Sequence, residues 1–175
     1  MLSLEIVRDS ARLREIVPEW EALTEKVDTV TPFQLPEWQM TWWTHFGSGT
    51  LHVMAFRDNE AIVGIVPCFL HQWNGRRQLT IIGSGISDYL EPVIQADHIE
   101  AVLQRLRIHL LAEKEWDVCD WQDLHGGTPL ARLESAELKV ERFADTICTE
   151  ARLTGTFEEF WIWRGKDLRR NQRRY

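Results

Sequence analysis

The spacing of hydrophobic residues in the first third of the chain predicts one strand followed by two helices. Leu2–Val7 alternates weakly between apolar and polar residues, as a strand does. Pro18 suits the first turn of a helix, because proline lacks the N–H that a helix start leaves unpaired. A second helix is predicted from Pro36 to Phe46, ending at Gly47.

The middle of the chain predicts an antiparallel meander. Three strand-like runs, 51–57, 61–73 and 78–82, are separated by short polar turns. The second turn, Asn74-Gly75, is a strong hairpin signal because both residues tolerate positive φ. A loop at 83–89 follows the third run.

Helical and strand patterns alternate again in the last part of the chain. Asp97 is expected to cap a helix with one apolar stripe, and 116–121 reads as a buried strand. A short helix is expected after the turn at 126–129, and 138–143 with 146–153 as a final pair of strands. The predicted fold class is therefore α/β (α+β), with a mixed, largely antiparallel sheet flanked by helices.

The predicted boundary of this domain is residue 155. Thr156 and Glu159 have the spacing of a capping box, which opens a basic helix over 156–175. Residues 164–175 contain six Lys and Arg and one acid, a net charge of +5. Because the whole chain has a net charge of −7, the first 163 residues have a net charge of −12. A body this acidic argues against nucleic acid as a partner, since DNA binding needs clustered positive charge. The tail alone remains a candidate anion-binding segment.

Composition indicates an ordinary globular chain, with 175 residues, 44% of them hydrophobic and 27% charged. The cysteines Cys68, Cys119 and Cys148 are far apart and odd in number, so they read as reduced thiols of a cytoplasmic protein. The start has no secretory signal, and the longest apolar stretch is too short to insert in a membrane. The histidines show no short ligand spacing, so no metal site is expected.

The loop Gly83-Ser84-Gly85 has two possible interpretations. It follows a strand, so its backbone N–H groups could cradle a phosphate, but it lacks the Gly-Lys-Ser/Thr of a P-loop, which favours a simple turn. Asp88 and Tyr89 behind it could contact a ligand. Alternatively, Asp88 accepts a backbone N–H in a local turn.

Tryptophan is unusually frequent, with nine residues. Most fall at core spacing in helices or strands, which favours packing. Aromatic platforms also bind sugars, so a carbohydrate-binding module is a rival class. Trp43 and Trp73 are the expected exceptions to burial.

Several motifs resemble the bacterial CelD/BcsL-type family of the GNAT acetyltransferase superfamily. They are Pro-Phe-x-x-Pro-x-Trp at 32–38, Ala-Ile-Val-Gly-Ile-Val-Pro at 61–67, Gly-Ser-Gly-Ile-Ser-Asp-Tyr-Leu-Glu-Pro at 83–92 and the arginine-rich segment at 168–174. The resemblance covers nearly the whole chain. It implies a GNAT-like sheet in a longer, FemAB-like tandem protein, acyl transfer from acetyl-CoA or another acyl-CoA, and a link to cellulose or exopolysaccharide biosynthesis.

The chain departs from this family pattern in two ways. It ends where a second GNAT-like half would begin, and its glycine turn lacks the preceding Gln or Arg and the following helix that hold the donor's pyrophosphate in GNAT proteins. The resemblance therefore implies an N-terminal, acceptor-side half that is incomplete for catalysis alone. No acyl-CoA is expected on this chain by itself, and no catalytic residue is assigned.

The substrate-binding candidates are in the loop, and the partner-binding candidates are in the tail. The loop residues are Ser84, Gly85, Ser87, Asp88 and Tyr89. The tail residues, expected to pair with the second half or with donor phosphates, are Arg169, Arg170, Arg173 and Arg174. The acceptor is expected to be a small molecule or polysaccharide-related, and an exposed apolar face favours self-association. Two alternatives stay open: a non-catalytic, Trp-rich polysaccharide- or protein-binding domain, and a fragment with no independent role.

Overall fold

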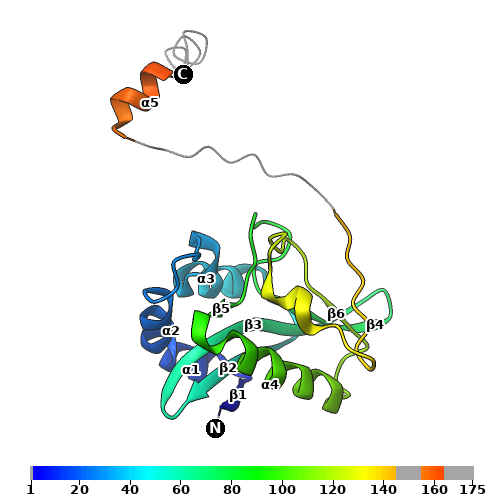
Figure 1. The fold of residues 1–175 in the computed structure, drawn as a ribbon. Coiled ribbons are helices and arrows are strands. Elements are labelled where there is room, and N and C mark those ends of the chain that lie inside the picture. Colours follow the sequence, from blue (N-terminus) through cyan, green and yellow to red (C-terminus); the bar gives the residue numbers. More distant parts are fainter. Residues whose placement is uncertain (1, 145–154, 164–175) are drawn as a thin grey trace. The chain divides into compact units, whose positions relative to one another are not determined.

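The computed structural model describes residues 2–144 and 155–163 (Figure 1). The chain divides into two compact units, Met1–Arg142 and Phe143–Tyr175. The first unit contains the sheet, and the described part of the second unit contains one short helix.

The first unit is built on one six-stranded sheet in which β1, β2, β3, β4 and β6 lie in that order. Every pairing is antiparallel except that of β4 with β6, and β5 pairs with β3 beyond the end of β4. The strands are β1 (Ser3–Val7), β2 (Thr50–Asp58), β3 (Ala61–Trp73), β4 (Arg76–Ile81), β5 (Val93–Ile94) and β6 (Val118–Asp120). The hairpin turn between β3 and β4 has positive φ at both Asn74 and Gly75, as its sequence predicts.

Helices cover both faces of this sheet (Figure 1). Along β2, Val53 and Ala55 belong to one core cluster, while Met54 and Phe56 belong to the other. The first cluster packs under α1 (Ser10–Glu15), α2 (Val17–Thr24) and α3 (Pro36–Phe46). The 3-10 turn η1 (Pro32–Gln34) lies between α2 and α3 in the chain and contacts α3. The second cluster packs under α4 (Ile99–Ala112), which follows the 3-10 turn η2 (Ala96–His98), and under η3 (Pro129–Leu133).

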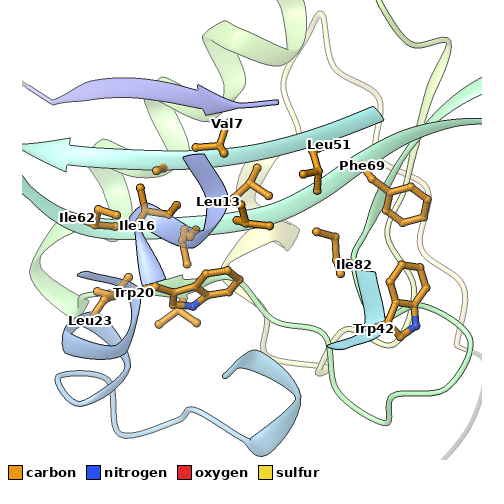
Figure 2. Close-up of a cluster of buried hydrophobic side chains, with 14 residues drawn as sticks. Val7, Leu13, Ile16, Trp20, Leu23, Trp42, Leu51, Ile62, Phe69 and Ile82 are labelled. Carbon is orange, nitrogen blue, oxygen red and sulfur yellow. The ribbon is translucent and has the colours of Figure 1, made fainter. Parts of the chain in front are cut away.

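The first core cluster fixes α3 above the sheet. Figure 2 shows Trp20 among aliphatic side chains and Trp42 facing Phe69. Trp20 is fully buried, and the rings of Trp42 and Phe69 lie 5.4 Å apart. Such aromatic contacts bury large apolar areas and hold the helix at one position over β3.

The sheet and its flanking helices confirm the predicted fold class. The capping prediction at Asp97 is wrong: this residue lies in η2, and α4 begins at Ile99 behind His98. The strand predicted at 116–121 is confirmed only over Val118–Asp120.

The strand predicted at 138–143 is also wrong. The Ser135 hydroxyl accepts hydrogen bonds from the Glu137 and Leu138 N–H groups, which makes a turn there. Residues 139–142 follow with charged side chains exposed, and no regular structure is present from 134 to 144. In this conformation Leu138 packs against the second core cluster, while the side chains of Lys139 and Glu141 are exposed. The strand predicted at 146–153 lies outside the described residues.

The second unit contains α5 (Phe157–Trp163). The capping box at its start is confirmed: the Thr156 N–H donates to the Glu159 carboxylate at 2.7 Å, and the Glu159 N–H donates to the Thr156 hydroxyl at 3.2 Å. The tail residues Arg169, Arg170, Arg173 and Arg174 lie outside the described residues. Among the described helices, none has the length and apolar character needed to cross a bilayer.

Candidate functional site

Two loops leave the sheet side by side from the carboxyl ends of β4 and β6. These strands form the one parallel pair of the described sheet, with Thr80 opposite Asp120 at its end. The Leu90 N–H donates to the Asp123 carbonyl at 2.9 Å, so the loop after β4 (residues 82–92) contacts the loop after β6 (residues 121–128). In open α/β sheets, ligands bind where parallel strands end and their connections diverge. We therefore take this loop pair as the candidate site.

The loop after β4 is anchored to α3 through Ser87. The Ser87 hydroxyl donates to the Gly83 carbonyl at 2.8 Å and accepts the Trp38 indole N–H at 3.0 Å. Ser87 is only 6% exposed, and Trp38 packs edge-on against Phe33. This hydroxyl therefore holds the loop in shape, and direct substrate binding by Ser87 stays a prediction.

The glycine turn uses its own polar groups internally. The Ser84 hydroxyl donates to the Ile81 carbonyl at 2.8 Å, and the Ile86 N–H donates to the Gly83 carbonyl at 3.5 Å. Gly85 is exposed with φ of 89°, and α4 begins only at Ile99. With amides engaged in the turn and no helix directly behind it, the residues present do not fit a pyrophosphate cradle. This favours the simple-turn interpretation.

Asp88 and Tyr89 are neighbours in the same loop but differ in solvent exposure. Asp88 is exposed, whereas Tyr89 is partly buried with its ring 6.4 Å from that of Phe33 and 5.6 Å from that of His125. Tyr89 thus bridges η1 and the second loop. The exposed carboxylate beside it is accessible to a ligand from solvent.

Glu91 is a site residue that sequence reasoning missed. One of its carboxylate oxygens accepts the His125 backbone N–H at 2.6 Å, and the Thr128 hydroxyl also bonds to it. Burial raises the pKa of Glu91, while the hydrogen bonds from Thr128 and His125 act in the opposite direction. The signal that could have found it is a lone acid inside the otherwise apolar segment 90–94.

The second loop contains a strained residue at the junction. Asp123, whose carbonyl accepts from Leu90, has φ of 58°, which is uncommon for a residue with a side chain. Such backbone conformations persist only where surrounding contacts enforce them, and they concentrate at functional sites. The interloop bonds supply those contacts.

The charge of the site is negative. The two loops and the ends of their strands carry Asp88, Glu91, Asp120 and Asp123, and the segments 78–104 and 115–131 contain no Lys or Arg. A surface of one sign attracts ligands of the other sign. The site therefore favours a cationic ligand over a phosphate-bearing one.

The structure confirms the prediction of buried tryptophans and of Trp73 as an exception, whereas the prediction for Trp43 is wrong. Trp20 and Trp42 are buried, while Trp73 is 60% exposed beside the β3–β4 turn. Trp43, the other expected exception, is partly buried with its ring 5.8 Å from that of Phe69. In the described part of the chain, packing accounts for most of these side chains.

Comparison with known proteins gives distant likenesses only. No family model matches the chain, and no curated protein matches it. Among solved structures, a ribosomal-protein-alanine N-acetyltransferase from Brucella melitensis biovar Abortus 2308 has a TM-score of 0.49 at 10% identity, covering 86% of this chain and 100% of that one. An aminoglycoside acetyltransferase from an uncultured soil metagenomic sample has a TM-score of 0.44 at 13% identity, covering 85% and 99%. An integron cassette protein of V. cholerae has a TM-score of 0.40 at 13% identity, covering 82% and 93%.

At these identities and TM-scores the likenesses assign neither a family nor a reaction to this chain. The function of this chain has to be inferred from its own residues.

Proposed function

We propose that this chain is the acceptor-side part of a GNAT-type acyltransferase, of the CelD/BcsL kind that its motifs resemble. It would serve the transfer of an acetyl or similar acyl group from acyl-CoA to an amine or hydroxyl. The observation that carries the proposal is Glu91, a partly buried carboxyl held where the loops after the parallel β4 and β6 meet. This supports acceptor chemistry at that end of the sheet.

The proposed reaction is direct attack on a thioester. The acceptor nitrogen or oxygen forms a bond to the acyl carbon, the carbon–sulfur bond breaks, and CoA leaves as a thiolate that takes up a proton. The acceptor must lose a proton in the process, and Glu91 is the proposed base. A raised pKa suits this role because a base works best when its pKa approaches the working pH. Asp88 and Tyr89 are proposed to position the acceptor.

The donor is proposed to bind outside the described residues. The hydrogen bonds within the glycine turn support this placement, because they already engage Ser84 and Ile86. A second GNAT-like half would supply that site, with Arg169, Arg170, Arg173 and Arg174 pairing with its acidic surface or with donor phosphates. A cytoplasmic location, a role in cellulose or exopolysaccharide biosynthesis and self-association of the chain remain predictions of the same proposal.

Two binding measurements test this function. In a thermal-shift titration of the chain, acetyl-CoA should give no saturable stabilisation. Spermidine and glucosamine serve as amine probes, and binding is followed by fluorescence because the Trp38 indole bonds to the loop. Saturable binding should weaken about tenfold or more in Asp88→Asn, the loss of roughly one charge-assisted contact. Asp97→Asn, an exposed acid in η2, is the matched control.

The outcomes separate the two parts of the proposal. Saturable stabilisation by acetyl-CoA would contradict the missing donor site. Failure of both amines to bind, or equal weakening by Asp88→Asn and Asp97→Asn, would contradict the acceptor site. Glu91→Gln should retain amine binding within a fewfold, because a base acts on the transferred proton rather than on ground-state affinity.

A second candidate function is polysaccharide or protein binding without catalysis. Trp73, exposed at the tip of the β3–β4 hairpin, is the observation that favours it. A soluble cellulose oligosaccharide should then quench tryptophan fluorescence in the wild type and not in Trp73→Ala. Quenching that survives this substitution would exclude Trp73 as the platform.

A further inference from the structure

Two histidines form a hydrogen-bonded pair between the sheet and α4. His52 on β2 is fully buried, and His109 on α4 is 8% exposed. Their Nε2 atoms lie 2.9 Å apart, and their rings are stacked with centroids 5.2 Å apart. Neutral imidazoles can make this bond only if one Nε2 donates and the other accepts.

The pair is covered by the turn that connects α4 to β6. Trp116 on this turn packs edge-on against His52, with ring centroids 5.1 Å apart, and lies 5.6 Å from the ring of His109. Beside it, Arg8 donates to Glu115 at 2.8 Å. The cluster of two imidazoles and one indole therefore joins β2, α4 and the turn before β6.

Several charged groups face the pair from the elements around it. From the α4–β6 turn, a Glu115 carboxylate oxygen lies 3.9 Å from His52 Nδ1, which is buried and without a hydrogen-bond partner. Glu113 and Glu115 attract positive charge on the pair, whereas Arg8 from the end of β1 and Arg105 from α4 repel it. On β3, the residue opposite His52 is Cys68, whose buried thiol has a raised pKa and carries no charge.

Burial has a larger effect on the two histidines than the neighbouring charges have, and it keeps both imidazoles neutral. It lowers the pKa of His52 to about 4, with His109 and Arg8 adding to the effect, and it lowers the pKa of His109 as well. The folded state therefore binds fewer protons than the unfolded chain. The stability contributed by His52 is complete above its ordinary pKa of 6.5 and is lost as the pH falls from 6.5 toward about 4.

Protonation changes the bond in two steps. A single proton makes one ring an imidazolium, which still donates to the neutral partner. A second proton leaves an N–H on each Nε2, so two donors and two positive charges face each other across 2.9 Å. The pair must then separate.

We propose that the His52–His109 pair is an acid-sensitive latch, which holds Trp116 and the end of α4 on β2 at neutral pH and releases them in acid. The turn that it holds leads directly into β6, which precedes the loop carrying Asp123 and His125. Release of the latch therefore loosens the strand pair under the candidate site. The inference rests on the His pair alone and does not require the proposed acyl transfer.

Amide hydrogen exchange on the full chain tests the latch. Between pH 7 and 4.5, protection of amides 113–120, corrected for intrinsic exchange, should fall about tenfold or more, while that of the β2–β3 core falls less than about threefold. The double variant His52→Leu/His109→Leu removes both titrating rings and keeps apolar packing. Amide protection in this double variant should fall less than about threefold in both regions between pH 7 and 4.5. His45→Gln, an exposed histidine at the end of α3, is the matched control and should behave as the wild type.

The proposal would be overturned if the double variant lost as much amide protection in acid as the wild type does. It would also be overturned if protection of amides 113–120 in the wild type did not change with pH. If the double variant does not fold, the imidazole nitrogen signals of the wild type decide. Both rings should titrate below the ordinary histidine range, and titration of either near 6.5 would refute the latch. The neighbouring ion pairs do not mimic it, because Arg8 lowers the pKa of Glu115, and Arg77 lowers that of Asp117 to about 2.

Discussion

The two glycines of the β4 loop allow the local packing of the candidate site to be measured separately from backbone strain. Gly83 has φ of 109° and Gly85 has φ of 89°, so alanine at either position adopts a backbone conformation that side chains rarely take. That strain costs roughly 1–2 kcal/mol. The surroundings differ: a Cβ at Gly85 meets no atom within 4 Å.

A Cβ at Gly83 would collide with the loop's own anchor. It would lie 2.6 Å from Leu90 Cδ2 and 3.0 Å from Ser87 Oγ. Leu90 is fully buried, and the Ser87 hydroxyl is bonded to both Gly83 and Trp38, so neither neighbour can move freely. Overpacking of this kind costs about 1–3 kcal/mol. Gly83→Ala should therefore destabilise by about 2–5 kcal/mol and Gly85→Ala by about 1–2 kcal/mol.

Urea unfolding followed by far-UV circular dichroism measures both variants. The midpoint should fall further for Gly83→Ala, with an unchanged slope, because the clash alters stability and not the surface exposed on unfolding. Tryptophan fluorescence of the folded state should also change in Gly83→Ala, since Trp38 bonds to Ser87. Equal destabilisation of the two variants, within about 0.5 kcal/mol, would refute the view that the loop is packed tightly onto α3.

Three further outcomes follow from burial and charge elsewhere in the fold. Trp20→Ala should lower the free energy of unfolding by about 3–5 kcal/mol, because this side chain is fully buried in the first core cluster; a loss below 1 kcal/mol would contradict that placement. Cys68 and Cys119 should resist alkylation at pH 8 until the chain unfolds, since burial raises the pKa of both thiols, that of Cys119 to about 12; peptide mass mapping that finds either labelled rapidly in the native chain would be inconsistent with this. Glu5, bonded to Arg12 and Arg57, has a lowered pKa, so its contribution is present above 4.5 and is lost as the pH falls below that value. Glu5→Gln should lower the free energy of unfolding by at most about 1 kcal/mol at pH 7, because the group is partly exposed. In urea titrations the difference between variant and wild type should disappear toward pH 3; a difference that persists there would indicate lost packing instead of lost ion pairs.

Local sequence signals predicted elements well where one residue type decides the backbone. Asn74-Gly75 fixes the hairpin turn, and Thr156 with Glu159 fixes the start of α5. The same signals failed at Asp97, because a 3-10 turn moves the start of α4 beyond it. They also failed at 138–143, where hydrogen bonds to Ser135 form a turn instead of a strand.

The candidate site could be predicted only in part, because its members come from separate segments. The loop after β4 was found from its glycines and its polar residues. Glu91 was not, since its environment depends on His125 and Thr128 across the second loop. The pairing of His52 with His109 was equally invisible, because residues 57 positions apart meet only when α4 packs on β2.

The sequence by itself determined the order of most helices and strands up to β6, the hairpin and the acidic character of the body. These follow from the spacing of apolar residues, from turn chemistry and from composition, which all act locally or as sums over the chain. The tertiary structure alone decided that β4 and β6 run parallel, that Ser87 is bonded on both sides, and that the two histidines are buried and neutral. Burial and long-range contact set these properties, because the desolvation of a side chain depends on neighbours that are remote in the sequence.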